Sequence, residues 1–208
     1  LYSRAFQMMM SANSLRVMAV MSDATNIIAE GEVLQLLNCH DADIDEARYL
    51  QVIHYKTAKL FEAATRLGAI LGAATSADEE AMAAYGMHLG TAFQLIDDVL
   101  DYSGDHAETG KNVGDDLAEG KTTLPLIHAM RHGNAQQAAS VRKAIEEGGL
   151  DDMQQVLLAI QETGALDYVR KQARIEADTA CAAISHLPDS NYKESLLQLA
   201  DFAVTRSF

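Results

Sequence analysis

The stretch GTAFQLIDDVLDY, residues 90–102, carries the pattern that decides the fold and the chemistry of this 208-residue chain. Its apolar residues continue a stripe that begins upstream, with a spacing of three or four, which predicts a helix over residues 76–102. A second face of this helix ends in carboxylates, because Asp97 and Asp101 are one turn apart and Asp98 lies beside them. Like charges at this spacing destabilise a helix, so we expect a cation to offset them, and a divalent metal ion is the simplest candidate.

The composition of the whole chain also favours helices. It holds only 2 Pro and 13 Gly, with Ala, Leu and Met abundant, which excludes an all-β protein. The net charge of −14 argues against a nucleic-acid partner, because phosphate backbones are bound by clustered Lys and Arg. Cys39 and Cys181 form no disulfide framework, and we expect buried free thiols in a reducing, cytoplasmic compartment. We see no leader and no apolar run of about 18 residues, so no membrane span is expected.

The rest of the chain is predicted to be helical as well. A helix capped by Ser14 over residues 14–38 is apolar around nearly its whole circumference, which predicts a place in the centre of a bundle. Further helices are expected over residues 124–131, 135–147, 151–163, 166–186 and 191–205. Because no linker or repeat divides the chain, we expect one all-α domain over residues 1–208.

Lys56 occupies an unusual position in the helix predicted over residues 45–72. It falls inside the apolar stripe of that helix, where an ammonium group should not be. Either its stem extends along apolar neighbours toward water, or it points into a cavity that holds an anion. The pattern leaves both interpretations open.

The one long irregular stretch that we predict, residues 105–121, follows the carboxylates. Part of it resembles a phosphate-binding P-loop, but the spacing from Gly114 to Gly120 is one residue too long and no strand precedes it, so we exclude nucleotide binding. Lys111 and Lys121 each follow a glycine. Two such lysines near a carboxylate cluster are suited to hold a metal-bound anion.

Together these motifs resemble the second aspartate-rich region of the trans-prenyltransferases, the polyprenyl diphosphate synthases. The resemblance rests on residues 90–102, on the Gly-Lys and Gly-Asp-Asp steps that follow, and on Lys56-Thr57, which stand where the family has its Lys-Thr pair. It covers essentially the whole chain. It implies an all-α isoprenoid-synthase fold, a helical bundle around a central cavity, usually paired as a homodimer. It also implies Mg²⁺-assisted condensation of isopentenyl diphosphate with an allylic diphosphate, giving an octaprenyl chain for a quinone.

The resemblance further implies a role for individual residues. The acids that help to bind one Mg²⁺ would be Asp97, Asp101 and, directly or through water, Asp98. The residues that contact the allylic diphosphate would be Lys56, Thr57, Gln94 and Lys111, with Lys121 closing over it. Lys56, Asp97 and Asp101 would be catalytic, because ionisation requires stabilisation of the charge that builds on the departing diphosphate.

The chain departs from the family pattern in one respect. The family's first aspartate-rich motif and its isopentenyl diphosphate residues belong upstream of Leu1. We therefore expect the chain to be the C-terminal portion of a synthase, inactive alone. Its apolar product would lie in a tunnel lined by Ala5, Met9 and the helix over residues 15–36. Two other functions stay open: a noncatalytic helical partner subunit, and a class I terpene cyclase.

Overall fold

The computed structural model describes residues 2–103, 113–148 and 152–206, and no strand occurs within these ranges. The helices before the carboxylate-rich stretch are α1 (Tyr2–Ser11), α2 (Leu15–Asn38), α3 (Glu46–Ile53), η1 (His54–Ala58) and α4 (Lys59–Leu71). Those that follow are α5 (Ser76–Ser103), α7 (Asp115–Ala118), α8 (Leu124–His132), α9 (Ala135–Glu147), α10 (Met153–Glu162), α11 (Ala165–Ala183) and α12 (Asn191–Thr205).

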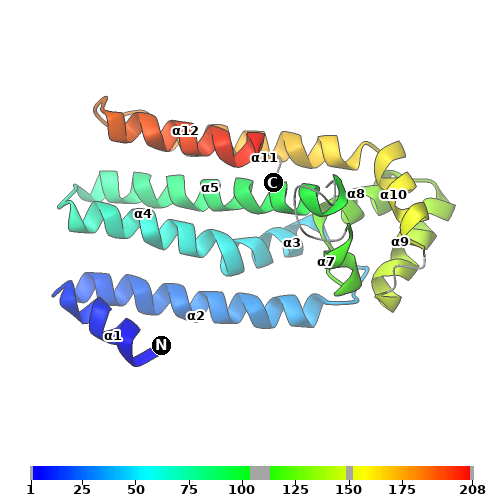
Figure 1. Cartoon of the computed structure of the whole chain (residues 1–208), viewed down its shortest axis with the longest axis horizontal. Coiled ribbons are helices and arrows are strands. Elements are labelled where there is room, and N and C mark those ends of the chain that lie inside the picture. Colours follow the sequence, from blue (N-terminus) through cyan, green and yellow to red (C-terminus); the bar gives the residue numbers. More distant parts are fainter. Residues whose placement is uncertain (1, 104–112, 149–151, 207–208) are drawn as a thin grey trace.

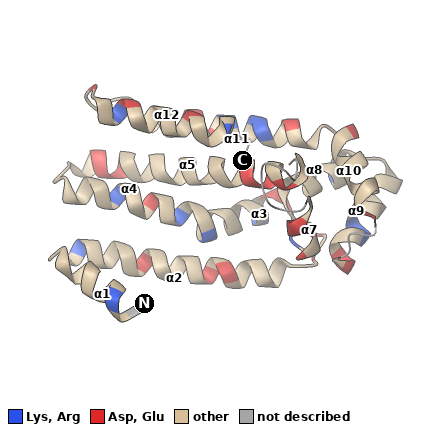
Figure 2. Ribbon diagram, in the orientation of Figure 1, with Lys and Arg blue, Asp and Glu red and all other residues tan. Residues whose placement is uncertain are grey.

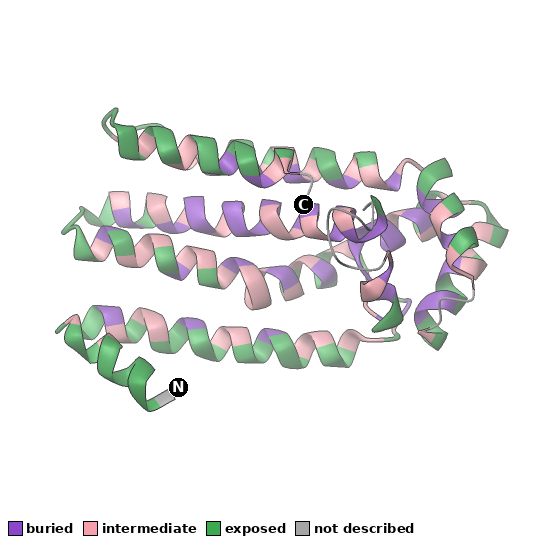
Figure 3. Cartoon of the chain, viewed as in Figure 1, coloured by how far each residue is buried: buried purple, intermediate pink, exposed green. Residues whose placement is uncertain are grey.

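The long helices lie side by side, with α5 in the middle of the bundle (Figure 1). Helix α5 packs against α4 on one side and against α11 and α12 on the other, whereas α8, α9 and α10 gather at one end. Buried residues follow α5 along much of its length (Figure 3), among them Tyr85, Leu89, Leu95, Ile96 and Val99. The helix that carries the carboxylates is therefore also the central support of the bundle.

The predicted position of the helix over residues 14–38 is wrong. Helix α2 begins as expected, since the Ser14 side chain accepts a hydrogen bond from the Val17 backbone N–H. It nevertheless lies at the outside of the bundle (Figures 1 and 3), and Leu36 and Leu37 are 72% and 71% exposed. Its neighbours in the described part of the chain are α1, α3, η1 and α4. A helix that is apolar on all sides favours burial, but its sequence does not show which other elements pack against each side.

The prediction of one continuous α-helix over residues 45–72 is also wrong, because a π-helical turn interrupts it. Between α3 and α4, the five residues of η1 adopt wider hydrogen bonding, and the Lys59 N–H donates to the His54 carbonyl, five residues earlier. Turns of this kind occur frequently at functional sites. Here the turn contains the Lys56-Thr57 pair.

Two other predictions need correction or qualification. The stretch predicted as irregular contains the short helix α7, preceded by Gly114 at φ 84°. Residues 104–112, including Lys111, lie outside the described residues.

Cys39 and Cys181 are free, as expected, but half-buried. None of the helices in the described ranges combines the length and apolarity that crossing a lipid bilayer requires.

Candidate functional site

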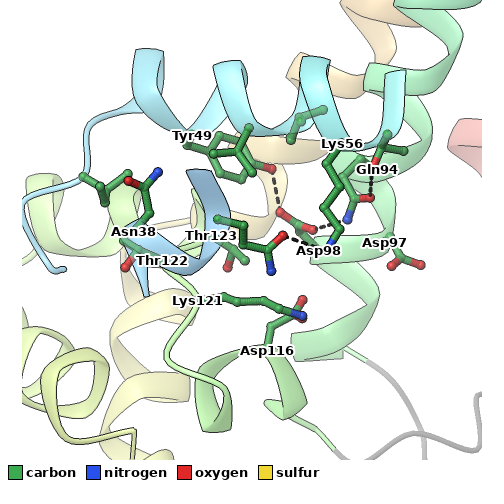
Figure 4. Close-up of a pocket in the computed structure, with 15 residues that line it drawn as sticks. Asn38, Tyr49, Lys56, Gln94, Asp97, Asp98, Asp116, Lys121, Thr122 and Thr123 are labelled. Atoms are coloured by element: carbon green, nitrogen blue, oxygen red, sulfur yellow. Dashed lines mark hydrogen bonds and ion pairs between the residues drawn. The ribbon is translucent and has the colours of Figure 1, made fainter. Parts of the chain in front are cut away.

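A pocket of about 260 Å³ lies among α2, α3, η1, α5 and the segment around α7 (Figure 4). Its lining includes six of the residues that the sequence analysis selected: Lys56, Thr57, Gln94, Asp97, Asp98 and Lys121. Asp101 is not among the lining residues, and Lys111 lies outside the described ranges. The pocket thus brings together cationic and anionic side chains from elements far apart in the sequence.

Lys56 reaches the pocket from the π-helical turn. Its Nζ donates a hydrogen bond of 2.8 Å to Gln35 Oε1 and lies 3.3 Å from Glu32 Oε2. Both partners come from α2. The ammonium group is therefore held by one amide and one carboxylate while it lines the cavity.

A chain of hydrogen bonds connects η1, α5 and α3 across the floor of the pocket. Thr57 Oγ1 donates to Gln94 Oε1 at 3.0 Å, and Gln94 Nε2 donates to Asp98 Oδ1 at 2.9 Å. The Tyr49 hydroxyl donates to the other carboxylate oxygen, Asp98 Oδ2, at 2.6 Å (Figure 4). Each oxygen of Asp98 thus accepts one hydrogen bond from the protein, which fixes the orientation of the carboxylate and leaves a second lone pair on each oxygen.

Burial sets the charge properties of this network. Asp98 is only 2% exposed, and this burial raises the pKa of its carboxyl group to about 7, although the hydrogen bond from Tyr49 opposes the rise. The pKa of Tyr49 is likewise raised, first by burial and then by the negative charge of Asp98. The tyrosine therefore remains the proton donor of the pair at neutral pH.

Asp97 and Asp101 occupy different environments although they are one turn apart. The side chain of Asp97 is 34% exposed, lines the pocket, and lies 3.5 Å from Arg206 Nη2. Asp101 is 8% exposed, and its Oδ2 accepts a hydrogen bond of 3.4 Å from the Asp116 N–H at the start of α7. Asp97 therefore faces the cavity, whereas Asp101 contacts the segment that follows α5.

Arg206 belongs to this site although it follows the last helix of the chain. Its guanidinium group lies over the Phe93 ring, 4.0 Å from the centroid, and donates to the Phe93 carbonyl at 3.0 Å. Together with its contact to Asp97, this places a cation beside a carboxylate that lines the pocket.

Lys121 enters the pocket from the segment after α7. Its Nζ lies 2.8 Å from Asp116 Oδ1 and 2.8 Å from Glu119 Oε2. Partial burial alone would lower the pKa of Lys121, but the hydrogen bonds to these two carboxylates outweigh it and raise the pKa. Lys121 is accordingly cationic at every physiological pH.

His40 fixes the backbone next to Lys121. The His40 N–H donates to the Gly120 carbonyl at 2.8 Å, and its ring Nδ1 lies 2.9 Å from the Ile145 carbonyl oxygen. On the other side of Lys121, Thr122 Oγ1 donates to the Asp41 carbonyl at 3.0 Å. The backbone on both sides of Lys121 is therefore attached to residues 40 and 41.

Substitution of Gly120 tests the contact between this segment and His40. It has φ +73°, and a Cβ there would lie 2.4 Å from His40 Cε1, so we expect Gly120→Ala to lower the free energy of unfolding by about 2–3 kcal/mol. Gly164 is the matched control, because it has φ +66° and a Cβ there meets nothing within 4 Å. Gly164→Ala should cost about 1 kcal/mol from backbone strain alone. Urea unfolding of both variants measures the difference, and equal losses would contradict a role for the His40 ring.

The carboxylates of the pocket have the donor chemistry that Mg²⁺ requires. Asp97, Asp98 and Asp116 all line it, and the ribbon shows acidic residues where α5 approaches α7 (Figure 2). Carboxylate oxygens, completed by water and phosphate oxygens, are the usual ligands of this ion. Within the described residues, however, no three acidic, histidine or cysteine side chains are already grouped around a common metal position. Asp97, Asp98 and Asp116 are the candidate magnesium ligands that line the pocket.

Comparison with known proteins connects this pocket to a family. The family model described as polyprenyl synthetase matches residues 1–162. The chain belongs to the polyprenyl synthetase family. This finding confirms the family resemblance seen in the aspartate-rich motif.

Individual polyprenyl synthetases are similar along the whole chain. It is 53% identical to octaprenyl diphosphate synthase of Haemophilus influenzae over 209 residues, covering 100% of this chain and 64% of that protein. Octaprenyl diphosphate synthase of Escherichia coli is 54% identical, with 99% of this chain and 64% of the relative covered. The chain thus spans 64% of the length of these two relatives.

Solved structures of the family confirm the all-α isoprenoid-synthase fold. A polyprenyl synthase from Caulobacter crescentus, complexed with calcium and isoprenyl diphosphate, has a TM-score of 0.94 and 42% identity, covering 100% of this chain and 64% of that one. A decaprenyl diphosphate synthase from Rhodobacter capsulatus has a TM-score of 0.91 and 40% identity, with the same coverage.

The sequence analysis missed several residues in or beside the pocket. Gln35, Tyr49 and Asp116 line it, and Arg206 contacts Asp97 beside it. Asp116 stood in a quoted motif without a role. Gln35 and Tyr49 lie on helices whose local patterns show no departure from ordinary helical surfaces, and Arg206 follows the last helix. Only the packing of these residues against α5 and η1 distinguishes them.

Proposed function

We propose that the chain forms the allylic diphosphate and metal site of an all-trans-polyprenyl diphosphate synthase whose product is octaprenyl diphosphate. The observation that carries this proposal is that Lys56 and Lys121 line the same pocket as the carboxylates of Asp97, Asp98 and Asp116. A metal diphosphate needs both signs of charge, cations for its oxygens and carboxylates for its metal. The identity of 53–54% to octaprenyl diphosphate synthases along the chain supports the choice of product.

In the proposed reaction, the allylic C–O bond breaks and the diphosphate leaves with the electron pair. Lys56, Thr57 and Gln94 bind the diphosphate from η1 and α5. Lys111 and Lys121 contact it from the segment after α5. The allylic cation then forms a bond with the alkene carbon of isopentenyl diphosphate, and the released diphosphate accepts the proton that is lost.

We propose that Asp97 and Asp101 would bind Mg²⁺. Asp98 would assist from its buried position, directly or through water. Mg²⁺, when bound, would neutralise the diphosphate oxygens as the leaving group departs. Asp97 is the leading ligand because its carboxylate lines the pocket and is one third exposed.

We expect Asp97→Asn to raise the Mg²⁺ concentration needed for half-maximal pyrophosphate binding by about tenfold, equivalent to about 1.4 kcal/mol. The reason is loss of an anionic oxygen donor at the most exposed member of the Asp97, Asp98 and Asp101 group. Isothermal titration calorimetry at several Mg²⁺ concentrations measures the change. Asp167→Asn is the control, since that side chain is 91% exposed on α11. An unchanged Mg²⁺ requirement in Asp97→Asn would remove this residue from the metal site.

Product analysis tests the function as a whole. The full-length protein, supplied with Mg²⁺, farnesyl diphosphate and isopentenyl diphosphate, should give a linear octaprenyl diphosphate. Cyclic hydrocarbons would instead support a terpene cyclase. A protein that gives no product alone, but increases the activity of a copurifying synthase even with Asp97→Ala, would support a noncatalytic partner. We propose a homodimer in the cytoplasm as the working form, on the family resemblance alone.

A further inference from the structure

Two helices approach the π-helical turn η1 so closely that only glycine fits at each contact. In Figure 1 the row formed by α3, η1 and α4 lies between α2 and α5, and both of these helices contact η1. A Cβ at Gly31 on α2 would lie 2.7 Å from the backbone nitrogen of Lys56 and 2.9 Å from the carbonyl carbon of Tyr55. A Cβ at Gly90 on α5 would lie 2.7 Å from Cα of Ala58. These atoms belong to the backbone, so they cannot rotate away.

Each of these glycines precedes, by one helical turn, a glutamine that holds the ligand-binding pair. Gln35 Oε1 accepts from Lys56 Nζ at 2.8 Å, and Gln94 Oε1 accepts from Thr57 Oγ1 at 3.0 Å. A spacing of four residues places glycine and glutamine on the same face of a helix. The same arrangement, Gly-x-x-x-Gln, thus occurs at residues 31–35 and 90–94.

The close contacts and the hydrogen bonds depend on one another geometrically. A glutamine side chain has a fixed reach, so the distance between helix axes decides whether its amide arrives at η1. A π-helical turn changes the direction in which the following side chains point, and it needs neighbours that support its wider backbone. Two glycine contacts from different helices provide that support on both sides of Lys56-Thr57.

We propose that Gly31 and Gly90 are positioning residues, which let α2 and α5 approach η1 until Gln35 and Gln94 hold Lys56 and Thr57 at the pocket. This inference rests on the proposed function, in which that pair binds a diphosphate. A methyl group at either glycine would separate the helices and displace the pair from its ligand. Displacements of about 1 Å can reduce the activity of a binding or catalytic group by about 100-fold.

The test measures binding of inorganic pyrophosphate, with Mg²⁺, to the full-length protein by isothermal titration calorimetry. We expect Gly31→Ala and Gly90→Ala each to weaken binding by roughly tenfold or more, as loss of a charged hydrogen bond would. Gly68→Ala on α4 is the matched control, because a Cβ there meets nothing within 4 Å. It should bind pyrophosphate as the unchanged protein does.

A double-mutant cycle separates positioning from a general structural effect. In a Lys56→Ala background, Gly31→Ala should weaken pyrophosphate binding by less than about twofold, because its effect passes through Lys56. A similar loss in both backgrounds would overturn the proposal. If Gly31→Ala prevents folding, Gln35→Ala takes its place in the cycle, since it leaves the helix contact unchanged, and the same two results decide.

The outcomes also distinguish this inference from the proposed function. Normal binding by Gly31→Ala, with weakened binding by Lys56→Ala, would overturn the positioning role and leave the diphosphate site intact. Absence of pyrophosphate binding by the unchanged protein, or no effect of Lys56→Ala, would overturn both.

Discussion

Lys56→Ala is expected to lower kcat/KM for the allylic diphosphate by about 100- to 1000-fold in the full-length protein. The Lys56 ammonium lines the pocket beside the Thr57–Gln94–Asp98 network, so it is placed to stabilise charge that builds on the departing diphosphate. Alanine removes that cation while the apolar part of η1 remains. Incorporation of labelled isopentenyl diphosphate into extractable product measures the loss.

Lys171→Ala provides the control for this substitution. Lys171 is exposed on α11 and does not line the pocket, so its loss changes the net charge of the protein by the same amount. We expect its kcat/KM to remain within about twofold of the unchanged protein. Equal, small effects of the two substitutions would show that Lys56 does not contact the reacting diphosphate.

The 208-residue chain by itself is expected to give no elongated product from Mg²⁺, farnesyl diphosphate and isopentenyl diphosphate. Its octaprenyl diphosphate synthase relatives are longer, and the chain covers 64% of them. The first aspartate-rich motif of the family and its isopentenyl diphosphate residues are not found among these 208 residues. A protein that includes those residues should be active in the same assay.

The elongation assay with the isolated chain can confirm or refute this prediction. Chromatography of the extracted products, with the longer protein as the positive control, would reveal any chain elongation. Formation of longer prenyl diphosphates by the isolated chain would refute the prediction and place both substrate sites within these residues.

Much of the fold could be predicted because helical periodicity is a local property. The helix expected over residues 76–102 is α5, and those expected over residues 135–147 and 191–205 have the bounds of α9 and α12. The π-helical turn could not be predicted, because one extra residue in a turn leaves the spacing of apolar residues within the range of an α-helix. The outer position of α2 was missed for a different reason, since burial depends on neighbours that periodicity does not identify.

Part of the candidate site could be predicted: helical spacing grouped the three acids of one helix, and the family resemblance added Lys56, Thr57 and Lys121 from other elements. Asp97, Asp98 and Asp101 were selected together from α5. Their environments differ because their partners come from other elements. Asp98 contacts Tyr49 and Asp97 contacts Arg206, both of which are 49 or more residues away in the sequence. Asp101 contacts the start of α7. Helical spacing assigns side chains to a face, but the packing of other elements decides which of them remain accessible to a ligand.

The attachment of Gly120 and Thr122 to residues 40 and 41 limits how Lys121 can respond to an anion. Because residues 120 and 122 are held by these contacts, the Lys121 amine changes position by rotation about the bonds of its side chain. Asp116 and Glu119 hold it in the meantime, so an incoming phosphate group must compete with two carboxylates for one ammonium. Binding of the proposed diphosphate by Lys121 would therefore exchange carboxylate oxygens for phosphate oxygens around its ammonium group, while the contacts of Gly120 and Thr122 stay in place.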